Sequence, residues 1–245
     1  MIEVEGISKN YGDYIAVSNI SFSASKGQIV GFLGPNGAGK TTTIRMLATF
    51  LPPSSGTARL AGFDILTQPD LVRQNIGYLP ENPPLYGEMT VSEYLHFVAE
   101  IKGVPRASVK SRVGEVLERC FIADVKGKLC QHLSRGYRQR VGLAQAIIHD
   151  PKVIILDEPT SGLDPKQIIE IRQLIKSLAE SHTVILSTHI LPEVSMVCTK
   201  VVIISKGRVV MESDMGDLTR EKSLEQVFLD SVSKEVVPDA AVVGL

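Results

Sequence analysis

The feature that most constrains this chain is a glycine-rich octapeptide at residues 34–41, which satisfies the pattern G-x-x-x-x-G-K-[ST]. A short apolar run at residues 28–33 precedes it, and a segment with helical apolar spacing follows it. The octapeptide therefore fits a loop that joins a buried strand to a helix. Its residues and the threonine after them are Gly34, Pro35, Asn36, Gly37, Ala38, Gly39, Lys40, Thr41 and Thr42.

This context predicts a binding site for a nucleoside triphosphate. Glycines allow backbone N–H groups to turn inward around phosphate oxygens, and the helix N-terminus adds about half a positive charge. We expect Lys40 to neutralise the terminal phosphates and the Thr41 hydroxyl to bind Mg²⁺. A turn that merely connects a strand to a helix would not need this Lys-Thr pair.

A second acidic motif follows another apolar run, at residues 153–156. The run ends in Asp157 and Glu158, which suits the second half of such a site. We expect Asp157 to hold Mg²⁺ through water, and Glu158 to orient or deprotonate the water that attacks the γ-phosphate. For Glu158 the alternative is a solvated acid that caps a helix, and the Pro-Thr-Ser-Gly-Leu-Asp run at residues 159–164 favours the catalytic interpretation.

Short apolar runs alternate with amphipathic stretches along the chain, which predicts an α/β fold. Residues 28–33, 153–156 and 183–186 are expected to form central parallel strands. Asp164 and Pro165 supply an N-cap and a first-turn proline for the helix that follows.

The middle of the chain, from about residue 90 to 136, has helical periodicity and no convincing strand. Thr90 and Glu93 form a capping-box pattern for one helix. Pro105 ends that segment, and Ser108 precedes a second periodic set. We therefore expect a helical insert whose two helices are separated by Pro105.

Further segments carry a resemblance to a known family. Residues 133–137, Leu-Ser-Arg-Gly-Tyr, resemble the L-S-G-G-Q signature, and residues 161–164 resemble the D-loop. His189 resembles the switch histidine, and Tyr11 resembles the aromatic residue that stacks on adenine. With the glycine-rich loop and the acidic pair in the same order, the chain resembles the ATP-binding subunit of an ABC transporter over nearly its whole length.

The resemblance implies a P-loop NTPase fold: a RecA-like, mostly parallel α/β core with an antiparallel β subdomain and a helical insert. We expect an ATPase domain over residues 1–220, its insert at about 88–136, and a short C-terminal extension over 221–245. ATP and Mg²⁺ are the implied cofactors. The implied catalytic residues are Lys40, Glu158 and His189.

The resemblance also implies an ATP-dependent homodimer. In the family, two subunits face each other head to tail, so the signature of one contacts the γ-phosphate bound by the other. Loss of that phosphate would open the dimer. The residues expected to contact nucleotide through this arrangement, beside those of the glycine-rich loop and Tyr11, are Ser134, Arg135, Gly136 and Asp164.

Three positions depart from the family pattern. Arg135 and Tyr137 stand where glycine and glutamine are usual in the signature. Glu81 stands where the Q-loop usually has glutamine; its carboxylate can still bind Mg²⁺ or nucleotide-bound water. These variations, with residues 224–229, are similar to the ABC-2 type exporter branch, which includes gliding-motility, drug and sodium exporters.

Composition limits the partners and the location. The chain of 245 residues has 26 Lys and Arg against 27 Asp and Glu, so it offers no strongly cationic surface and no nucleic-acid partner is expected. Cys120, Cys130 and Cys198 are scattered, which favours neither a disulfide framework nor a zinc site. We see no export signal, and every apolar run is far shorter than the roughly 20 residues that span a bilayer. The expected location is the cytoplasmic face of the membrane, held there by a permease.

The leading hypothesis is a motor subunit that drives a separate integral membrane permease. The loop at residues 83–89, with Leu85, Tyr86 and Met89, is a candidate docking surface for that permease, or else it fills the seam between core and insert. The alternative function is a soluble ABC ATPase that acts on ribosomes or DNA. A P-loop kinase would leave the signature and the switch histidine without a role.

Overall fold

The computed structural model describes residues 1–221, 224–226 and 228 of the chain. Its central sheet has six strands in the order β10-β9-β3-β8-β7-β6. All neighbours from β9 to β6 are parallel, and β10 is antiparallel to β9. The strands are β3 (Ile29–Leu33), β6 (Ile76–Leu79), β7 (Val153–Asp157), β8 (Thr183–Thr188), β9 (Lys200–Ser205) and β10 (Arg208–Asp214).

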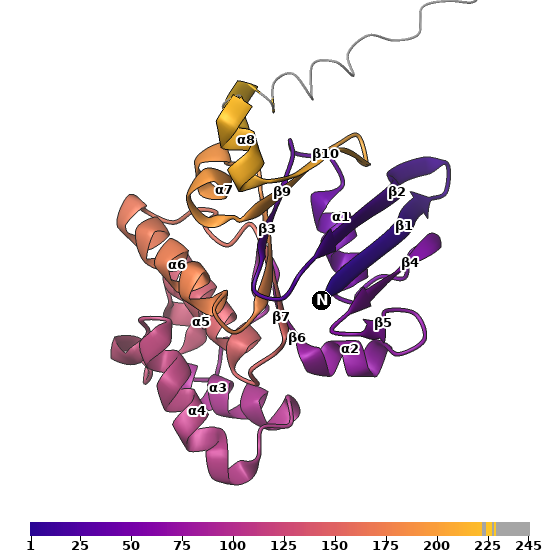
Figure 1. Cartoon of the computed structure of the whole chain (residues 1–245). Helices are drawn as coiled ribbons and strands as arrows, with labels where there is room; N and C mark the ends of the chain where they lie inside the picture. Colours follow the sequence, from indigo (N-terminus) through magenta and orange to yellow (C-terminus); the bar gives the residue numbers. More distant parts are fainter. Residues whose placement is uncertain (222–223, 227, 229–245) are drawn as a thin grey trace, which may run out of the picture.

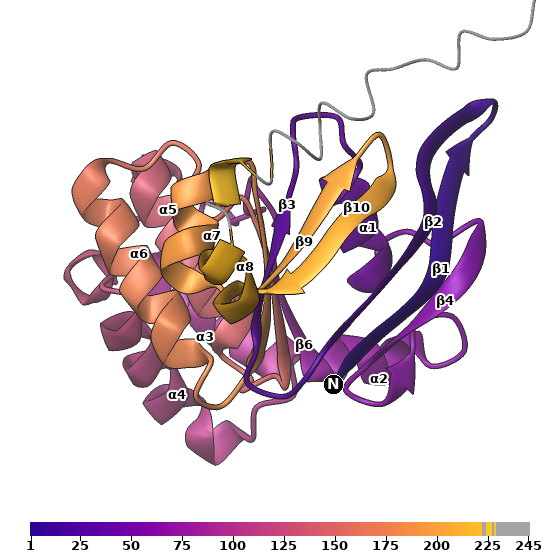
Figure 2. The same ribbon diagram turned by 45° about the horizontal axis from the view of Figure 1, so that its top comes forward.

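The three strands predicted from apolar runs are central and fully buried, as expected for parallel strands covered on both faces. A second, antiparallel sheet of four strands stands beside them, in the order β2-β1-β4-β5 (Figure 1). Helix α1 (Lys40–Leu47) lies between the two sheets (Figure 2). The strands of the second sheet are β1 (Ile2–Tyr11), β2 (Tyr14–Ala24), β4 (Ser55–Leu60) and β5 (Phe63–Asp64).

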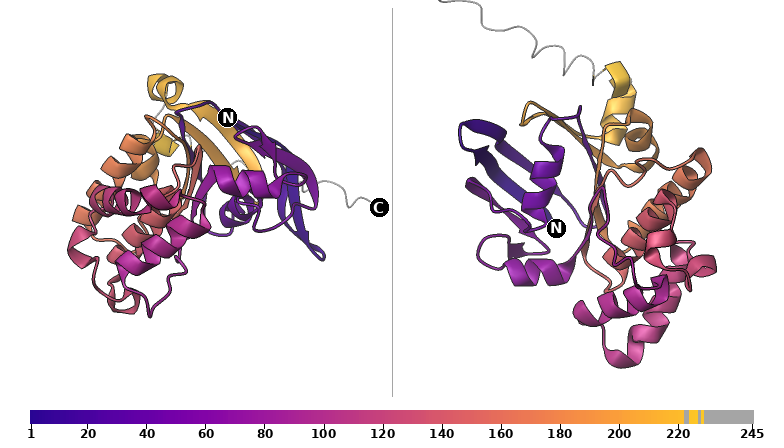
Figure 3. Two further views of the ribbon diagram at one scale, coloured as in Figure 1. Left: turned by 90° about the horizontal axis from the view of Figure 1, so that it is seen from below. Right: turned by 180° about the vertical axis from the view of Figure 1, so that it is seen from behind.

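Apolar side chains from both sheets and α1 form one core. In it, the ring centroids of Phe32 and Phe22 lie 5.5 Å apart. Most helices gather on the opposite face of the central sheet and enclose a second core (Figure 3). The helices are α2 (Pro69–Asn75), α3 (Val91–Ile101), α4 (Arg106–Arg119), η1 (Ala123–Val125), η2 (Cys130–His132), α5 (Arg135–Ile147), α6 (Pro165–Leu178), α7 (Leu191–Val197) and α8 (Met215–Glu221).

The insert is helical, and its first helix starts where the sequence predicts. Glu93 N–H donates to Thr90 Oγ1 at 3.2 Å, and the Thr90 N–H donates to the Glu93 carboxylate at 2.8 Å, which completes the capping box. Pro105 separates α3 from α4, as the sequence predicts. Helix α4 begins at Arg106 after Pro105, and Ser108 N–H donates to the Pro105 carbonyl within the first turn.

The three cysteines are buried and free, and burial raises the pKa of Cys120 to about 12. At the other end of the chain, Leu224 and Phe228 pack against the core. The rest of the extension expected over 221–245 lies outside the described residues, apart from Glu221, Glu225 and Gln226.

Candidate functional site

The glycine-rich loop connects β3 to α1, as its flanks predict. A Cβ atom on Gly34 would lie 2.3 Å from the Ile204 carbonyl oxygen, so only glycine fits there. Gly39 has φ +100, a conformation that other residues rarely adopt, and it is the N-cap of α1. Backbone geometry therefore explains why the loop carries glycine at these two positions. The second of them, Gly39, directly precedes Lys40.

The Lys40 ammonium is buried at the start of α1. Its Nζ donates to the Gly34 carbonyl at 2.8 Å and the Pro35 carbonyl at 3.2 Å, and it lies 3.7 Å from Glu158 Oε1. Burial lowers the pKa of Lys40, while the charges of Glu158 and Asp157 oppose that shift. The loop thus holds the Lys40 ammonium at the N-terminus of α1, where it could contact a bound polyphosphate.

A cavity of about 470 Å³ opens beside this loop. It collects residues from β1, β2, the glycine-rich loop, and the segments that follow β6, β7 and β8. Residues that sequence reasoning assigned separately to base, phosphate and water therefore face one space. The lining residues are Tyr11, Tyr14, Ala16, Asn36, Gly37, Gly39, Lys40, Thr41, Thr42, Glu81, Glu158, Ser161 and His189.

Two exposed tyrosines border the cavity. Tyr11 and Tyr14 pair across the β1–β2 turn and are 49% and 63% exposed. Sequence reasoning found Tyr11 and missed Tyr14. The Tyr-Gly-Asp-Tyr spacing, with a positive φ at Gly12, is the hairpin signal that could have found it.

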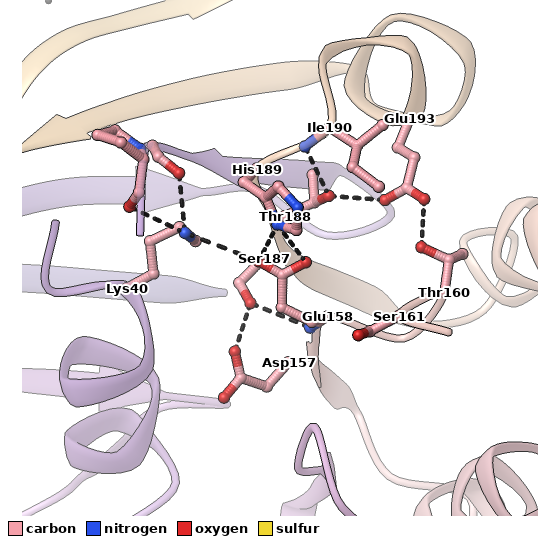
Figure 4. Close-up of polar contacts among 12 residues, drawn as sticks. Lys40, Asp157, Glu158, Thr160, Ser161, Ser187, Thr188, His189, Ile190 and Glu193 are labelled. Carbon is pink, nitrogen blue, oxygen red and sulfur yellow. Dashed lines mark hydrogen bonds and ion pairs between the residues drawn. The ribbon is translucent and has the colours of Figure 1, made fainter. Parts of the chain in front are cut away.

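Asp157 and Glu158 lie at the end of β7, next to the end of β8. Asp157 pairs with Ser187 in the parallel register, and Ser187 Oγ donates to Asp157 Oδ1 at 2.5 Å (Figure 4). Thr41 Oγ1 lies 3.4 Å from the same carboxylate oxygen. A hydroxyl from α1 and a carboxylate from β7 thus converge, which is an oxygen donor set suited to Mg²⁺.

Glu158 points toward His189. The His189 Nδ1 atom lies 3.0 Å from each Glu158 carboxylate oxygen (Figure 4). Glu158 adopts φ +50, which is uncommon for a residue with a Cβ atom and costs of order 1–2 kcal/mol. The Ser187 hydroxyl accepts from the Glu158 N–H at 3.2 Å and stabilises this conformation.

Glu81 follows β6 and lines the same cavity with an exposed side chain. Its charge acts on Lys40, whose pKa it tends to raise. The structure thus brings Glu81 to the cavity that Lys40 and Glu158 also line. Gly34, Pro35 and Ala38 of the loop, and Asp157 beside Thr41, are not among the described residues that line the cavity.

The signature residues and Asp164 of the D-loop lie outside the cavity, although Ser161 at the start of the D-loop lines it. Of the described residues, those lining the cavity do not include Ser134, Arg135, Gly136 or Asp164. Ser134 is the N-cap of α5 and accepts from the Tyr137 N–H at 3.4 Å, while Asp164 caps α6 and accepts from the Gln167 N–H at 2.9 Å. Each caps its own helix within one chain.

The two signature departures make contacts inside the chain. Arg135 donates through Nη2 to Ser161 Oγ at 3.0 Å, which joins the signature helix to the segment after Glu158. Tyr137 donates its hydroxyl to Asp124 Oδ2 at 2.6 Å, which joins α5 to η1. These side chains brace α5 against its neighbours, a role that the sequence did not suggest.

Comparison with known proteins decides which family this is. Residues 17–161 match the family described as ABC transporter. The chain belongs to the ABC transporter family. It is an ATP-binding subunit and an ATPase, so the kinase alternative is excluded. Residues 131–196, which contain Glu158 and His189 but not Lys40, also match a family described as AAA domain, putative AbiEii toxin, Type IV TA system.

Curated relatives support the assignment. The chain is 38% identical to the uncharacterized ABC transporter ATP-binding protein YxlF of Bacillus subtilis, over 96% of this chain and 78% of that one. It is 37% identical to ABC transporter ATP-binding protein NatA of the same species, over 90% and 92%. It is 36% identical to Nod factor export ATP-binding protein I of Ralstonia nicotianae, over 89% and 68%.

Solved structures share the fold. The structure described as an ATP binding subunit of an ABC transporter superposes with a TM-score of 0.86 at 29% identity, over 94% of this chain and 99% of that one. The dimeric bacterial ABC transporter cassette MJ0796 superposes with a TM-score of 0.80 at 26% identity, over 88% and 99%. The predicted fold class is confirmed.

Proposed function

We propose that this ATPase is the motor of an exporter whose permease is a separate membrane protein, and that it works as a homodimer. One observation supports the proposal most: Lys40, Glu158 and His189 share a cavity, while the signature caps a helix outside it. A site divided in this way needs a second copy to complete it. The export assignment rests on the similarity to a Nod factor export protein and on the ABC-2 type loop variations.

The cavity would bind ATP in one orientation, with the base near the two tyrosines and the phosphates near the glycine-rich loop. Tyr11 and Tyr14 offer aromatic faces at one border, where the adenine base would stack. The glycine-rich loop and Lys40 would hold the phosphates. Thr41 and Asp157 would hold Mg²⁺, with Glu81 as a further acidic group at the cavity wall. The bound ion would offset negative charge on the phosphates and help position them.

Glu158 is placed to act on water. Its carboxylate is buried beside Lys40 and faces His189, so a water between Glu158 and the γ-phosphate would donate to Glu158 and become more nucleophilic. His189 would fix the orientation of the Glu158 carboxylate and, like Lys40, would contact the γ-phosphate. Hydrolysis in this scheme needs no acceptor other than water.

The dimer would supply the missing contacts. Ser134, Arg135, Gly136 and Asp164 would face the nucleotide of the second copy, an arrangement consistent with the dimeric cassette that this chain resembles. A γ-phosphate at the N-terminus of α5 would join the two copies, because helix N-terminal N–H groups bind anions. Hydrolysis would then release the dimer.

The permease would dock on the loop before α3. Leu85 and Met89 pack against the core, so these two residues fill the seam. Tyr86 is 54% exposed, and its ring makes a T-shaped contact with Tyr94 and a tilted contact with Phe97. We assign the docking role to Tyr86. No helix in the described residues has the length and apolarity to span a bilayer, and we place the subunit on the cytoplasmic face of the membrane through its permease.

We retain the expected division into an ATPase domain over 1–220, with its insert at about 88–136, and an extension over 221–245. In this division the docking loop leads into the insert and the signature closes it, so the insert would connect permease and nucleotide.

Mixed dimers test the proposal. Lys40→Ala would disable the cavity of a subunit, and Ser134→Arg would disable its signature. Each variant alone should be inactive in ATP hydrolysis. A mixture should regain activity, because one heterodimeric site combines an intact cavity with an intact signature. A mixture no more active than its two parts would overturn the divided site, and stable co-purification with ribosomes or DNA instead of a permease would favour the alternative function.

A further inference from the structure

A buried carboxylate behind the catalytic pair is not used by this scheme. Glu193, the third residue of α7, is 1% exposed. It accepts a hydrogen bond from the Thr160 hydroxyl through Oε1, and one from the Thr188 hydroxyl through Oε2 at 2.7 Å (Figure 4). Among the described residues no ion pair to Glu193 is found. Burying a carboxylate costs free energy because the group loses its hydration, and the two hydrogen bonds offset part of that cost. The position of Glu193 therefore calls for a structural or functional reason.

Each threonine lies close in sequence to a proposed catalytic residue: Thr160 in the turn after β7, and Thr188 at the end of β8. Thr160 follows Glu158 by two positions, in a turn closed by the Ser161 N–H, which donates to the Glu158 carbonyl at 3.1 Å. Thr188 immediately precedes His189, and its hydroxyl accepts from the Ile190 N–H at 3.1 Å. Glu193 therefore joins the turn after β7 to the turn after β8.

We propose that Glu193 is a positioning residue that sets the contact between Glu158 and His189 by holding Thr160 and Thr188 in fixed register. The inference rests on the proposed catalytic roles of Glu158 and His189. Both residues lie just beyond Asp157–Ser187, the last pair of β7 and β8, where the Glu158 N–H still donates to the Ser187 carbonyl at 3.1 Å but no further strand pair joins Glu158 to His189. Beyond that pair, the Glu193 carboxylate connects the two chain segments through its hydrogen bonds with Thr160 and Thr188.

Two substitutions of similar length separate hydrogen bonding from volume. Glu193→Gln keeps an acceptor oxygen for one threonine and offers an N–H₂ donor to the other, whose hydroxyl can rotate to accept. Glu193→Met fills similar space but leaves Thr160 and Thr188 without their acceptor. Thr160→Val and Thr188→Val remove the donors one at a time and serve if the methionine variant does not fold. Glu180→Met is the control at an exposed position.

The first readout needs no activity. In the chain labelled with ¹⁵N-histidine, the ring signals of His189 report its contact with Glu158, and His189→Gln identifies them among the 5 histidines. Glu193→Met, or each Thr→Val change, should shift or broaden the His189 signals and leave the other histidines unchanged. Glu193→Gln and Glu180→Met should retain them. His189 signals that do not change in Glu193→Met would overturn the proposal.

The second readout is kinetic. Glu193→Met should lower the kcat for ATP roughly ten- to hundredfold, as expected for a small misplacement of a catalytic pair, with an unchanged KM. Glu193→Gln should recover most of the rate. A lower melting temperature with unchanged kcat per folded molecule would show a purely structural role. If the unmodified chain bound ATP without hydrolysing it, the proposed function would fail, whereas the histidine spectra would still judge Glu193.

Discussion

His189 Nδ1 lies 3.0 Å from both carboxylate oxygens of Glu158, although the two residues come from different strand ends. The carboxylate is also 3.7 Å from the Lys40 ammonium. Glu158 thus stands between a histidine and a lysine on the wall of one cavity. This placement lets one carboxylate contact both Lys40, the proposed phosphate-binding cation, and His189, the proposed switch residue.

Lys40→Ala should weaken ATP binding. The substitution removes a buried charge-assisted contact worth about 1.5–3 kcal/mol, which corresponds to a roughly ten- to hundredfold rise in Kd. Isothermal titration with ATP measures it, and Lys26→Ala, at an exposed lysine away from the cavity, is the matched control. An unchanged Kd for Lys40→Ala would mean that the phosphates lie elsewhere.

Glu81→Gln should leave ATP binding intact and change the Mg²⁺ dependence of hydrolysis. An amide can still contact the ion or its water through oxygen, but it lacks the negative charge that Glu81 brings to the cavity. Steady-state ATPase rates over a Mg²⁺ titration provide the test, with Glu180→Gln as control. Superimposable titrations of the variant and the unmodified chain would show that Glu81 only faces solvent.

Tyr86→Asp should leave the isolated subunit folded and able to bind ATP but reduce co-purification with its permease and abolish transport. The Tyr86 ring is 54% exposed, and its aromatic contacts are worth about 0.5–1.5 kcal/mol, so its loss alone should not unfold the chain. Ile169→Asp on α6, where the native side chain is 55% exposed, is the matched control. Normal assembly and transport would exclude docking at Tyr86, and unfolding would show that it fills the seam.

Stability should fall in mild acid because of His149. Burial, and secondly the charge of Lys102, lower the pKa of His149 to about 4, below its ordinary value of 6.5. Between these pH values the unfolded chain binds a proton that the folded chain does not, so the free energy of unfolding falls as pH drops, by at most about 3 kcal/mol.

Urea unfolding at pH 7.5 and pH 5 measures the loss. His149→Gln can still donate to the Ile76 carbonyl, which His149 Nε2 contacts at 3.0 Å, and it should remove most of the difference between the two pH values. His132→Gln, at an exposed histidine, should not. Equal acid sensitivity in the unmodified chain and His149→Gln would assign the effect to other groups.

Some elements of this fold can be predicted from short sequence patterns alone. Strands β3, β7 and β8 are continuous apolar runs, and the starts of α3 and α6 carry complete capping boxes. The second sheet was expected only from the family resemblance. The pairing of β1 with β2 shifts register at three points between Val4 and Asn10, which interrupts the alternation that would reveal a strand.

The site divides in the same way. Lys40, Thr41, Asp157 and Glu158 could be predicted because each lies beside a strand or helix end in a short motif. Glu193 could not, because its partner Thr160 lies 33 positions away and only the parallel neighbours β7 and β8 bring the two together. Contacts of that kind depend on topology and leave no local pattern.

The most direct test of the account is the association state of Glu158→Gln. The substitution should spare ATP binding while slowing the chemical step about 10²–10⁴-fold, because it removes the group that acts on water. Sedimentation of this variant with Mg²⁺ should show a dimer in ATP and a monomer in ADP. A variant that stays monomeric with ATP bound, or that hydrolyses ATP at the normal rate, would contradict it.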